Sequence, residues 1–328
     1  MTDITMIDAA AARLKGHARR TPLLSSPFLD EIEGRHVLVK PEALQHTGSF
    51  KFRGGWSAVS ALDPETRKRG VIAFSSGNHA QGVAYAAKLH GAPAVIIMPA
   101  DAPRLKIDNT RALGAEVITY DRATEDRDAI GARLAEERGL SLIKPFDNPY
   151  VIAGQGTVGL EIAEQAAEEG VDAADVLVCC GGGGLTSGIA LALEARAPGL
   201  RTRPVEPEGF DDVARSLKSG QIERNARSSG SLCDAIITPA PGLMTFPIMH
   251  RLCGPGVVVP ERDCLRAMAL AFTRLKVVLE PGGAIALAAA LFHPETVEGD
   301  AVIAVASGGN VDAALFAKVL EEFGEGIY

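Results

Sequence analysis

Cysteine is scarce in this sequence, and aromatic side chains make up only 5% of the residues, with a single tryptophan. The five cysteines are odd in number and form neither a Cys-x-x-Cys pair nor a cluster with histidines at zinc spacing. This pattern argues against a disulfide framework or a zinc site and predicts buried, reduced thiols. Acidic residues outnumber basic ones by 41 to 33, and the net charge of −8 argues against nucleic acid or a membrane surface as a partner.

Long hydrophobic runs are also missing, because no apolar stretch is long enough to span a bilayer. The first 20 residues mix charged side chains with short apolar pieces, so no signal or transit peptide is expected. Together with the reduced cysteines, this predicts a cytoplasmic location. With 328 residues and 47% hydrophobic side chains, the chain is expected to form two compact lobes.

From residue 71 onward, short apolar stretches alternate regularly with helical ones. Strands are expected at 71–74, 94–98, 116–120 and 142–145, and helices at 77–90, 102–113 and 124–138. This rhythm predicts a parallel, doubly wound sheet with right-handed crossovers. The small domain is predicted to span residues 53–147.

The same alternation resumes further along the chain. A helix is expected at 150–169, another from 185, and strands at 36–40, 175–180, 202–205 and 301–306. These elements predict a larger, cofactor-binding domain made of residues 1–52 and 148–328. The polar segment 219–241, rich in serine, proline and arginine, is expected to be a surface excursion. The expected fold class is therefore α/β, with two lobes that each contain a mostly parallel twisted sheet flanked by helices.

Lys51 follows a Gly-Ser-Phe turn and opens a helix. Most lysines in such a place are solvated helix charges. Here Phe50 and Phe52 flank the amine, and Gly54 and Gly55 allow close approach of another backbone. Because a desolvated lysine has a lowered pKa and becomes nucleophilic, Lys51 is a candidate to carry a cofactor once other motifs support it.

The glycine run 181–184 lies between an expected strand and an expected helix. This position brings free backbone N–H groups and a helix N-terminus to one point, which suits a bound anion such as phosphate. A flexible turn would explain the run equally well. Because neither the Gly-Lys-Ser/Thr of a Walker loop nor a clear dinucleotide spacing is present, a nucleotide is the weaker interpretation.

Two further turns, 75–79 and 307–310, also lead from a strand toward a helix. The N–H and hydroxyl groups of 75–79 could hold a substrate carboxylate, and Asn78 could bond a ring hydroxyl. Simple helix capping is the alternative, since serine and asparagine are preferred caps. Taken with Lys51 and the glycine run, the two turns point to pyridoxal phosphate.

These four stretches, in this order and at these separations, resemble the fold-type II pyridoxal-phosphate enzymes of the tryptophan synthase β type. Within that group, the sequence resembles the serine/threonine dehydratase and serine racemase family more closely, and members of the 3-hydroxyaspartate dehydratase type are among the candidates. The resemblance extends from Thr21 to Asn310. It implies a short catabolic form of the enzyme and a homodimer.

The resemblance also implies roles for individual residues. Lys51 would bind the cofactor covalently and remove the α-proton, while Ser76 would exchange a proton on the opposite face. Ser307 would face the pyridine nitrogen and leave it unprotonated, which favours loss of a β-substituent over a long-lived carbanion. The other implied contacts are Phe50, Asn78, Gly181, Gly182, Gly183, Gly184 and Leu185 for the cofactor, and Ser75, Ser76, Asn78, His79, Arg127 and Thr238 for the substrate.

An acidic loop follows the expected strand 202–205. By the same resemblance, Glu206, the carbonyl of Phe210 and Asp212 would bind a divalent cation such as Mg²⁺, Ca²⁺ or Mn²⁺, in keeping with the preference of such ions for oxygen ligands. A solvated acidic turn is the alternative for these residues.

The implied reaction is loss of water from a β-hydroxy-α-amino acid, giving a keto acid and ammonia. Threonine, serine and 3-hydroxyaspartate are the candidate substrates. The last is favoured if Arg127 and Thr238 meet a second carboxylate, although Arg127 could equally be an exposed helix charge. A serine or aspartate racemase with the same residues is the alternative enzyme, and a non-catalytic nucleotide-binding protein is the alternative of another class.

Overall fold

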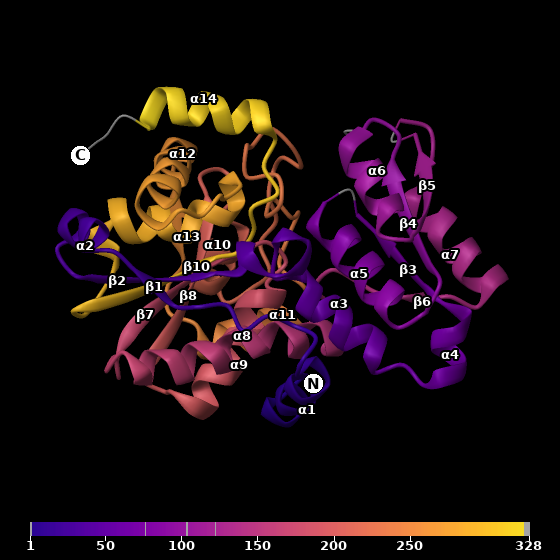
Figure 1. Ribbon diagram of the computed structural model, residues 1–328, viewed down its shortest axis with the longest axis horizontal. Coiled ribbons are helices and arrows are strands. Elements are labelled where there is room, and N and C mark those ends of the chain that lie inside the picture. The colour runs from indigo at the N-terminus through magenta and orange to yellow at the C-terminus, as the bar shows by residue number, and fades with distance from the viewer. Residues whose placement is uncertain (1, 76, 103, 122, 325–328) are drawn as a thin grey trace.

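The strands of the computed structural model, which describes residues 2–75, 77–102, 104–121 and 123–324, form two separate sheets (Figure 1). The larger sheet has six strands in the order β1-β2-β10-β7-β8-β9, and the smaller has four in the order β5-β4-β3-β6. Their bounds are β1 Leu24–Ser25, β2 His36–Pro41, β3 Val71–Phe74, β4 Ala94–Pro99, β5 Glu116–Tyr120, β6 Ser141–Leu142, β7 Ala174–Cys179, β8 Leu200–Pro207, β9 Val257–Val259 and β10 Ala301–Ala306.

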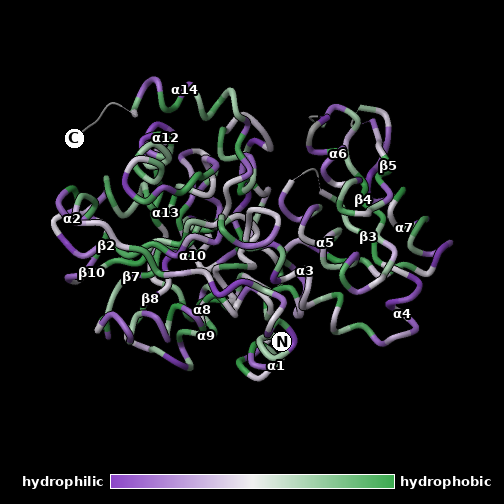
Figure 2. The backbone as a smooth tube through the Cα atoms, viewed as in Figure 1, coloured by the Kyte–Doolittle hydropathy of each residue, from purple (hydrophilic) through white to green (hydrophobic). Residues whose placement is uncertain are grey.

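All neighbouring strands run parallel except β1, which pairs antiparallel with β2. The central strands β7 and β10 are buried at every position, and Figure 2 shows them as apolar stretches within the larger lobe. Such continuous apolar runs are typical of parallel strands with both faces covered. Here α13 packs against one side of the sheet and α9 against the other (Figure 1).

Helices cover both sheets and join the two lobes. The α-helices are α1 Ile4–Leu14, α2 Pro27–Glu33, α3 Lys51–Ser60, α4 Pro64–Arg69, α5 Asn78–Leu89, α6 Arg104–Ala112, α7 Arg127–Arg138, α8 Pro149–Glu168, α9 Gly184–Arg196, α10 Asp212–Ser219, α11 Thr245–Leu252, α12 Glu261–Leu270, α13 Pro281–Phe292 and α14 Ala313–Phe323. Short 3₁₀ turns occupy Glu42–Leu44, His46–Gly48 and Pro294–Thr296, and a π-turn occupies Ala271–Leu275.

Local sequence explains where several of these helices begin. Asn148 caps α8 by accepting hydrogen bonds from two backbone N–H groups, and Pro149 takes the first helical position, where it loses no helical hydrogen bond. Asp63 and Asp126 cap α4 and α7 in the same way. The caps therefore set the starts of α4 and α7 beside the smaller sheet and of α8 in the larger lobe.

Helices α3 and α5 pack with their backbones in close contact. A Cβ added to Gly55 would lie 2.9 Å from the carbonyl oxygen of Gly82, and one added to Gly82 would lie 2.8 Å from the carbonyl oxygen of Lys51. No side chain fits at such distances without a shift of the backbone. Glycine at both positions thus lets the helix of Lys51 rest directly on the helix that starts at Asn78.

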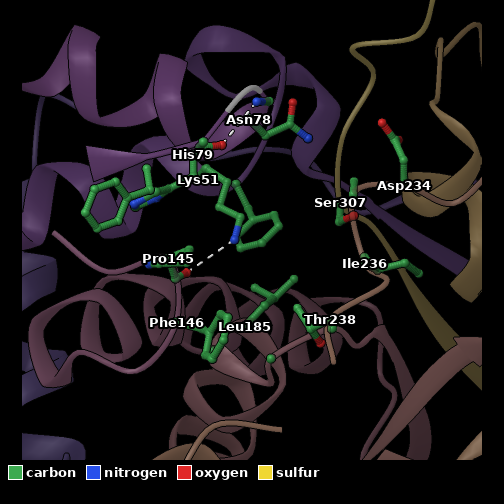
Figure 3. A pocket seen from close by; sticks show the side chains of 18 of the residues that line it. Lys51, Asn78, His79, Pro145, Phe146, Leu185, Asp234, Ile236, Thr238 and Ser307 are labelled. Carbon is green, nitrogen blue, oxygen red and sulfur yellow. Dashed lines mark hydrogen bonds between the residues drawn. The ribbon is translucent and has the colours of Figure 1, made fainter. Parts of the chain in front are cut away.

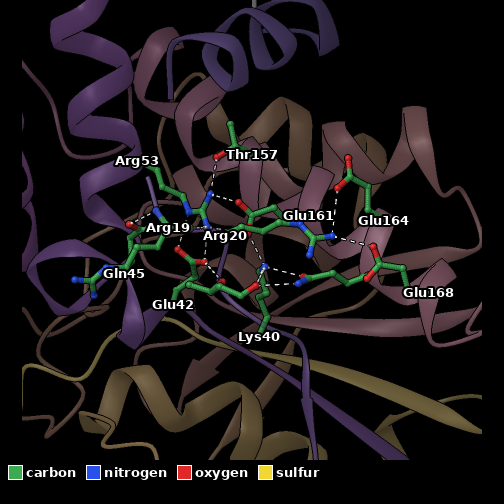
Figure 4. A network of polar contacts seen from close by, with 12 residues as sticks. Arg19, Arg20, Lys40, Glu42, Gln45, Arg53, Thr157, Glu161, Glu164 and Glu168 are labelled. Carbon is green, nitrogen blue, oxygen red and sulfur yellow. Dashed lines mark hydrogen bonds and ion pairs between the residues drawn. The ribbon is translucent and has the colours of Figure 1, made fainter. Parts of the chain in front are cut away.

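A buried ionic network joins β2, α3 and α8 (Figure 4). Arg53 forms ion pairs with Glu42 and Glu161, each at 2.7 Å. Lys40 donates hydrogen bonds to Glu161 at 2.6 Å and to the carbonyl of Thr21 at 2.8 Å. Because each buried charge has an opposite charge beside it, the network holds the start of α3 to the larger lobe at a reduced desolvation cost.

The predicted fold class is confirmed: two lobes with mostly parallel sheets flanked by helices. The strand expected at 142–145 is shorter than predicted, since β6 ends at Leu142. Strands β1 and β9 were not predicted, because two or three residues carry no readable periodicity. The strands of the smaller sheet lie between residues 71 and 142, and we propose 53–147 as the small domain and 1–52 with 148–328 as the large one.

None of the helices in the described part of the chain is both long and apolar enough to cross a membrane.

Candidate cofactor and substrate pocket

A pocket of about 360 Å³ lies where the strands of both sheets end. Residues that follow β3, β7 and β10 line it, as expected of parallel sheets, which bind ligands beyond the carboxyl ends of their strands. Its lining comprises Phe50, Lys51, Phe74, Ser75, Gly77, Asn78, His79, Ile97, Pro99, Lys106, Tyr120, Arg127, Pro145, Phe146, Cys179, Gly181, Gly182, Gly183, Gly184, Leu185, Thr186, Asp234, Ala235, Ile236, Thr238, Glu280 and Ser307.

The turn before Lys51 is tied to the turn after β10. The N–H of Phe50 donates to the carbonyl of Ser307 at 3.1 Å, and the N–H of Gly309 donates to the carbonyl of Gly48 at 2.9 Å. These bonds place Lys51 at the start of α3, with its side chain directed into the pocket (Figure 3). Two motifs more than 250 residues apart in the sequence thus meet at one site.

The Lys51 amine is buried and has few partners. Its Nζ donates to the carbonyl of Pro145 at 3.3 Å and lies 4.9 Å from the centre of the Phe50 ring. Burial lowers the pKa of Lys51 to about 8, while the nearby Cys179 and Glu280 work in the opposite direction. A lysine of this kind is available as a neutral, nucleophilic amine near physiological pH.

The glycine loop 181–184 forms a cradle beside Lys51. Gly183 has φ +88°, and a Cβ there would lie 2.5 Å from Met249, while one on Gly182 would lie 2.3 Å from the Phe146 ring. The loop leads into α9, whose first N–H groups have no partner within the helix. A phosphate group fits this N–H-lined loop, and the close packing of the loop against Met249 and Phe146 leaves no room for a side chain at either glycine.

Asn78 is fixed by two polar neighbours. Its Nδ2 donates to Glu280 at 2.6 Å, and its Oδ1 accepts a hydrogen bond from Asn310 at 2.7 Å. The amide orientation is therefore set by both partners, and one N–H is left for a pocket ligand. This suits the predicted bond to a cofactor hydroxyl.

Glu280 was not anticipated from the sequence. Its carboxyl group is buried, and desolvation raises its pKa to about 7, while the hydrogen bond from Asn78 opposes this shift. A Cβ added to Gly308 would lie 2.2 Å from the Glu280 Oε1, so the 307–310 turn closes directly over the carboxyl group. The available signal was a glutamate immediately before Pro-Gly-Gly, which looks like an ordinary helix start.

His79 also lines the pocket but is held by the backbone. Its Nε2 donates to the carbonyl of Ile143 at 2.8 Å. Burial, with the charge of Lys51 as the next cause, lowers the pKa of His79 to about 3, so the ring is neutral. A substrate contact from His79 therefore has to use the rest of the neutral ring.

Ser307 lies in the pocket beside Cys179, whose Sγ donates to the Ser307 Oγ at 3.1 Å. Burial raises the pKa of Cys179 to about 11, so it remains a thiol. With the thiol as its donor, the serine hydroxyl can direct its own proton to another acceptor.

The predicted substrate residues lie around the same pocket. The Ser75 Oγ accepts a hydrogen bond from the N–H of Gly77 at 3.1 Å, and the Thr238 Oγ1 is buried without a partner in the described chain. Arg127 opens α7 with its guanidinium 5.6 Å from the Phe74 ring centre and its side chain 49% exposed. Ser76 falls outside the described residues.

The segment 219–241 does more than cover the surface. Asp234, Ala235, Ile236 and Thr238 line the pocket, and Ile236 is buried, so the expectation of a plain surface excursion is wrong for this part. The resemblance had already assigned Thr238 to the substrate, but the polar composition of the segment alone gave no sign of a pocket wall, because pocket walls and exposed loops use similar residues. Lys106, from α6, was likewise missed among ordinary helix charges.

The predicted metal residues lie apart from this pocket lining. The Glu206 carboxylate accepts hydrogen bonds from the N–H groups of Val213 and Ala214, and the Asp212 Oδ2 is buried without a partner in the described chain. Burial, and then the charge of Asp212, raises the pKa of Glu206 well above its ordinary value. Among described residues, no cluster of three or more His, Cys, Asp or Glu side chains is present, so any ion would need backbone or water ligands.

Comparison with known proteins agrees with this geometry. A family model described as pyridoxal-phosphate dependent enzyme matches residues 14–308. The chain is 44% identical over 312 residues to an L-threo-3-hydroxyaspartate ammonia-lyase from Pseudomonas sp, covering 95% of this chain and 96% of that protein.

Two solved structures are similar throughout. The threonine deaminase of T.th. is 44% identical with a TM-score of 0.89, covering 94% of this chain and 99% of that one. Maize serine racemase is 38% identical with a TM-score of 0.89, covering 98% and 99%. The prediction of a pyridoxal-phosphate enzyme is confirmed, and this chain belongs to the pyridoxal-phosphate dependent enzyme family.

Proposed function

We propose that this protein is an ammonia-lyase that converts a β-hydroxy-α-amino acid to a keto acid and ammonia, with L-threo-3-hydroxyaspartate as its preferred substrate. The observation that carries the proposal is the buried Lys51 amine, with a pKa of about 8, facing a glycine cradle in a pocket that also holds Lys106 and Arg127. The similarity to an L-threo-3-hydroxyaspartate ammonia-lyase along nearly the whole chain favours this substrate.

The fit of pyridoxal phosphate rests on the residues already described. Gly181 to Gly184 with Leu185 would hold the phosphate, Phe50 would pack on the ring, Asn78 would donate to the ring hydroxyl, and Ser307 would face the ring nitrogen. When bound, the cofactor supplies an electron-accepting ring attached to the amino group of the substrate.

The protein supplies proton transfer and positioning. Lys51 Nζ, once free, accepts the proton from the α-carbon, and its lowered pKa keeps it neutral enough to do so. The neutral ring of His79 adds no positive charge to the pocket. Ser307, as a hydroxyl instead of a carboxylate, does not hold a proton on the ring nitrogen, and this favours departure of the β-hydroxyl group.

The substrate carboxylate would bind to the turn at 75–79, as predicted for Ser75, Ser76, Asn78 and His79. Arg127 and Thr238 would meet the second carboxylate of hydroxyaspartate, and the unpartnered Thr238 Oγ1 supports that assignment because it can donate to a ligand oxygen.

A divalent cation, with Mg²⁺ first and Ca²⁺ or Mn²⁺ as alternatives, would bind Glu206, the carbonyl of Phe210 and Asp212. The support is chemical: two buried carboxyl groups lie close together, and the Asp212 Oδ2 has no partner in the described chain. A hard cation with added water ligands would satisfy both groups. Its role would be structural, because the site shares no residue with the pocket lining.

The protein is further proposed to be a cytoplasmic homodimer. Leu44, Phe272 and Val278 are exposed apolar side chains, and a second copy of the chain is the natural cover for them. The reduced state of all five cysteines supports a reducing compartment.

The test is release of keto acid and ammonia from L-threo-3-hydroxyaspartate, its erythro isomer, L-threonine and L-serine, each with and without Mg²⁺. Fastest release from the L-threo isomer is expected. Racemised residual substrate with little keto acid would favour a racemase instead. If visibly yellow protein releases no product from any of the four amino acids, the proposed reaction is overturned, whereas the assignment of the cofactor stands.

A further inference from the structure

An ion pair crosses the pocket between the two lobes. Lys106 belongs to α6, beside the smaller sheet, and its Nζ lies 3.8 Å from Asp234 Oδ2 in the loop that follows α10. Both side chains line the pocket, and Figure 3 shows Asp234 on the same side of it as Ser307. The roles assigned above use neither charge.

This pair is held more loosely than the other charges of the pocket. The distance of 3.8 Å is long for an ion pair, the Asp234 side chain is 69% exposed, and the Lys106 side chain is 33% exposed. Exposed pairs of this kind contribute little to stability, so either partner can be exchanged at small cost. Asp234 can return to water, whereas Lys106 stays over the pocket.

Arg127 has two contacts on its own lobe. Its guanidinium lies over the Phe74 ring, 5.6 Å from the ring centre, and its Nε is 3.5 Å from Asp128 on the same helix. Lys51 is committed to the cofactor in the proposed function. Lys106 is therefore a further cation of the pocket that can accept a new anion, and it is the one whose present partner lies across the pocket.

We propose that Lys106 is a specificity-determining residue that binds the second carboxylate of a dicarboxylic substrate together with the Arg127 and Thr238 assigned above, and that the Asp234 carboxylate is its partner in the free enzyme. The inference rests on the proposed function, which it extends to the choice between hydroxyaspartate and neutral hydroxy amino acids. The incoming carboxylate replaces the carboxylate of Asp234, so the charge beside Lys106 is unchanged. Thr238, with its unpartnered hydroxyl, is the matching neutral donor.

Neutral substrates meet a different situation. Serine and threonine carry no anion to exchange with Asp234, so the ion pair remains and takes no part in their binding. A dicarboxylic substrate that failed to displace Asp234 would place two negative charges side by side, which costs free energy. A second carboxylate therefore binds favourably only when it replaces Asp234 as the partner of Lys106.

The experiment compares kcat/KM for L-threo-3-hydroxyaspartate with that for L-serine in Lys106→Met, Lys106→Arg and Asp234→Asn. Lys106→Met is expected to lower the ratio of the two values by about 10- to 100-fold, the range for loss of a charged contact to a substrate carboxylate. Lys106→Arg is expected to restore most of the ratio. Asp234→Asn is expected to raise the ratio several-fold in the wild-type background. In combination with Lys106→Met, it is expected to leave the ratio unchanged.

Lys68→Met is the matched control, since Lys68 forms an exposed ion pair with Glu65 at 2.8 Å on the same lobe and does not line the pocket. It should leave the ratio at the wild-type value. An equal loss for both substrates in Lys106→Met would overturn the proposal, and so would the full change in ratio from Arg127→Met with none from Lys106→Met.

A binding measurement separates this inference from the proposed function. Succinate should raise the melting temperature of the wild-type holoenzyme more than butyrate does, and Lys106→Met should abolish the difference. If hydroxyaspartate is not turned over, the proposed substrate fails, yet this result would still support a carboxylate site at Lys106. Equal effects of succinate and butyrate on the wild type would overturn the inference, whatever the enzyme turns over.

Discussion

Lys40 and Lys51 lie close together in the sequence; Lys40 is fully buried, Lys51 is half-buried at the pocket, and the partners of their amines differ. The Lys40 Nζ has three partners between 2.6 and 2.8 Å, including the carboxylate of Glu161. Among the residues that the structure describes, the Lys51 Nζ has one carbonyl partner at 3.3 Å and no carboxylate partner. Burial lowers the pKa of each, but only Lys40 has a carboxylate in contact to stabilise its charge. Burial with an ion partner makes a structural lysine, and burial without one makes a reactive lysine.

The largest expected effect comes from replacing the reactive lysine. Lys51→Met should lower turnover by more than about 1,000-fold, because it removes both the cofactor attachment and the proton acceptor. The visible absorbance band of the bound cofactor should disappear, while the unfolding free energy of the apoprotein should stay the same or increase. Absorbance spectra and urea unfolding check both points, and a variant that keeps the band would remove Lys51 from its proposed role.

Replacing the structural lysine should have the opposite result. Lys40→Met leaves Gln165 without its buried donor and leaves Glu161 with Arg53 alone, and it should lower the unfolding free energy by about 1.5–3 kcal/mol. The cofactor band should remain in the folded fraction. Arg20→Met is the control, since it removes only exposed ion pairs and should cost less than about 1 kcal/mol. Similar losses in the two variants would contradict the contrast between buried and exposed pairs.

Glu280 is the corresponding case for an acid: its carboxyl group is buried and forms no ion pair with any cation in the described part of the chain. Its pKa is raised from 4.5 to about 7, so the folded protein keeps this proton where the unfolded chain has released it. The stabilising contribution is therefore present below about pH 4.5 and is lost as the pH rises to about 7, amounting to at most about 3 kcal/mol.

Glu280→Gln should abolish that part of the pH dependence. Urea unfolding of wild type and variant at pH 5, 6, 7 and 8 would measure it, with the exposed Glu65→Gln as control. The variant should also weaken the hold on Asn78 and lower turnover by about tenfold, in line with the loss of one positioning hydrogen bond. Parallel stability curves for wild type and Glu280→Gln would contradict the assignment of the raised pKa.

The smallest effect is expected at the acidic loop. If a divalent cation occupies Glu206 and Asp212, EDTA should lower the melting temperature by about 2–4 °C, and Mg²⁺ should restore it. Asp212→Asn should no longer respond to either treatment. Identical melting curves with EDTA and with Mg²⁺ would show that these two carboxyl groups, unlike Glu42, remain buried without a cation.

Much of the fold could be predicted because apolar strands and helices alternate with a clear period. The runs that became β3, β4 and β10 are uniformly apolar, the run of β7 is apolar except for Asp175, and each is followed by a turn and a helix. Lys51 and the glycine run were also readable, because Gly, Ser and Asn mark turns through their backbone preferences. The sequence pattern therefore located the strand ends, where the pocket lies.

Other parts of the pocket depend on contacts between distant residues, which no local pattern contains. The burial of Glu280 depends on Gly308, which packs directly against its carboxyl group. The role proposed for Lys106 depends on Asp234, which lies across the pocket from it. The partners of Arg53 are likewise Glu42 and Glu161, the second more than 100 residues away. Charged residues look alike in a sequence, whether solvent or another residue neutralises them.

The contact of α3 with α5 through Gly55 and Gly82 has a mechanical consequence. Because two backbones meet there without intervening side chains, the helices behave as one rigid body that carries Lys51 at one point and Asn78 at another. The Arg53 network holds the start of α3 to the larger lobe, and Asn78 is bonded to Glu280 and Asn310 of that lobe. If the rest of the smaller lobe rotates to admit a substrate, amine and amide would therefore stay with the larger lobe, and their separation would not change. Opening of the pocket would then alter access for the amino acid while leaving the grip on the cofactor constant.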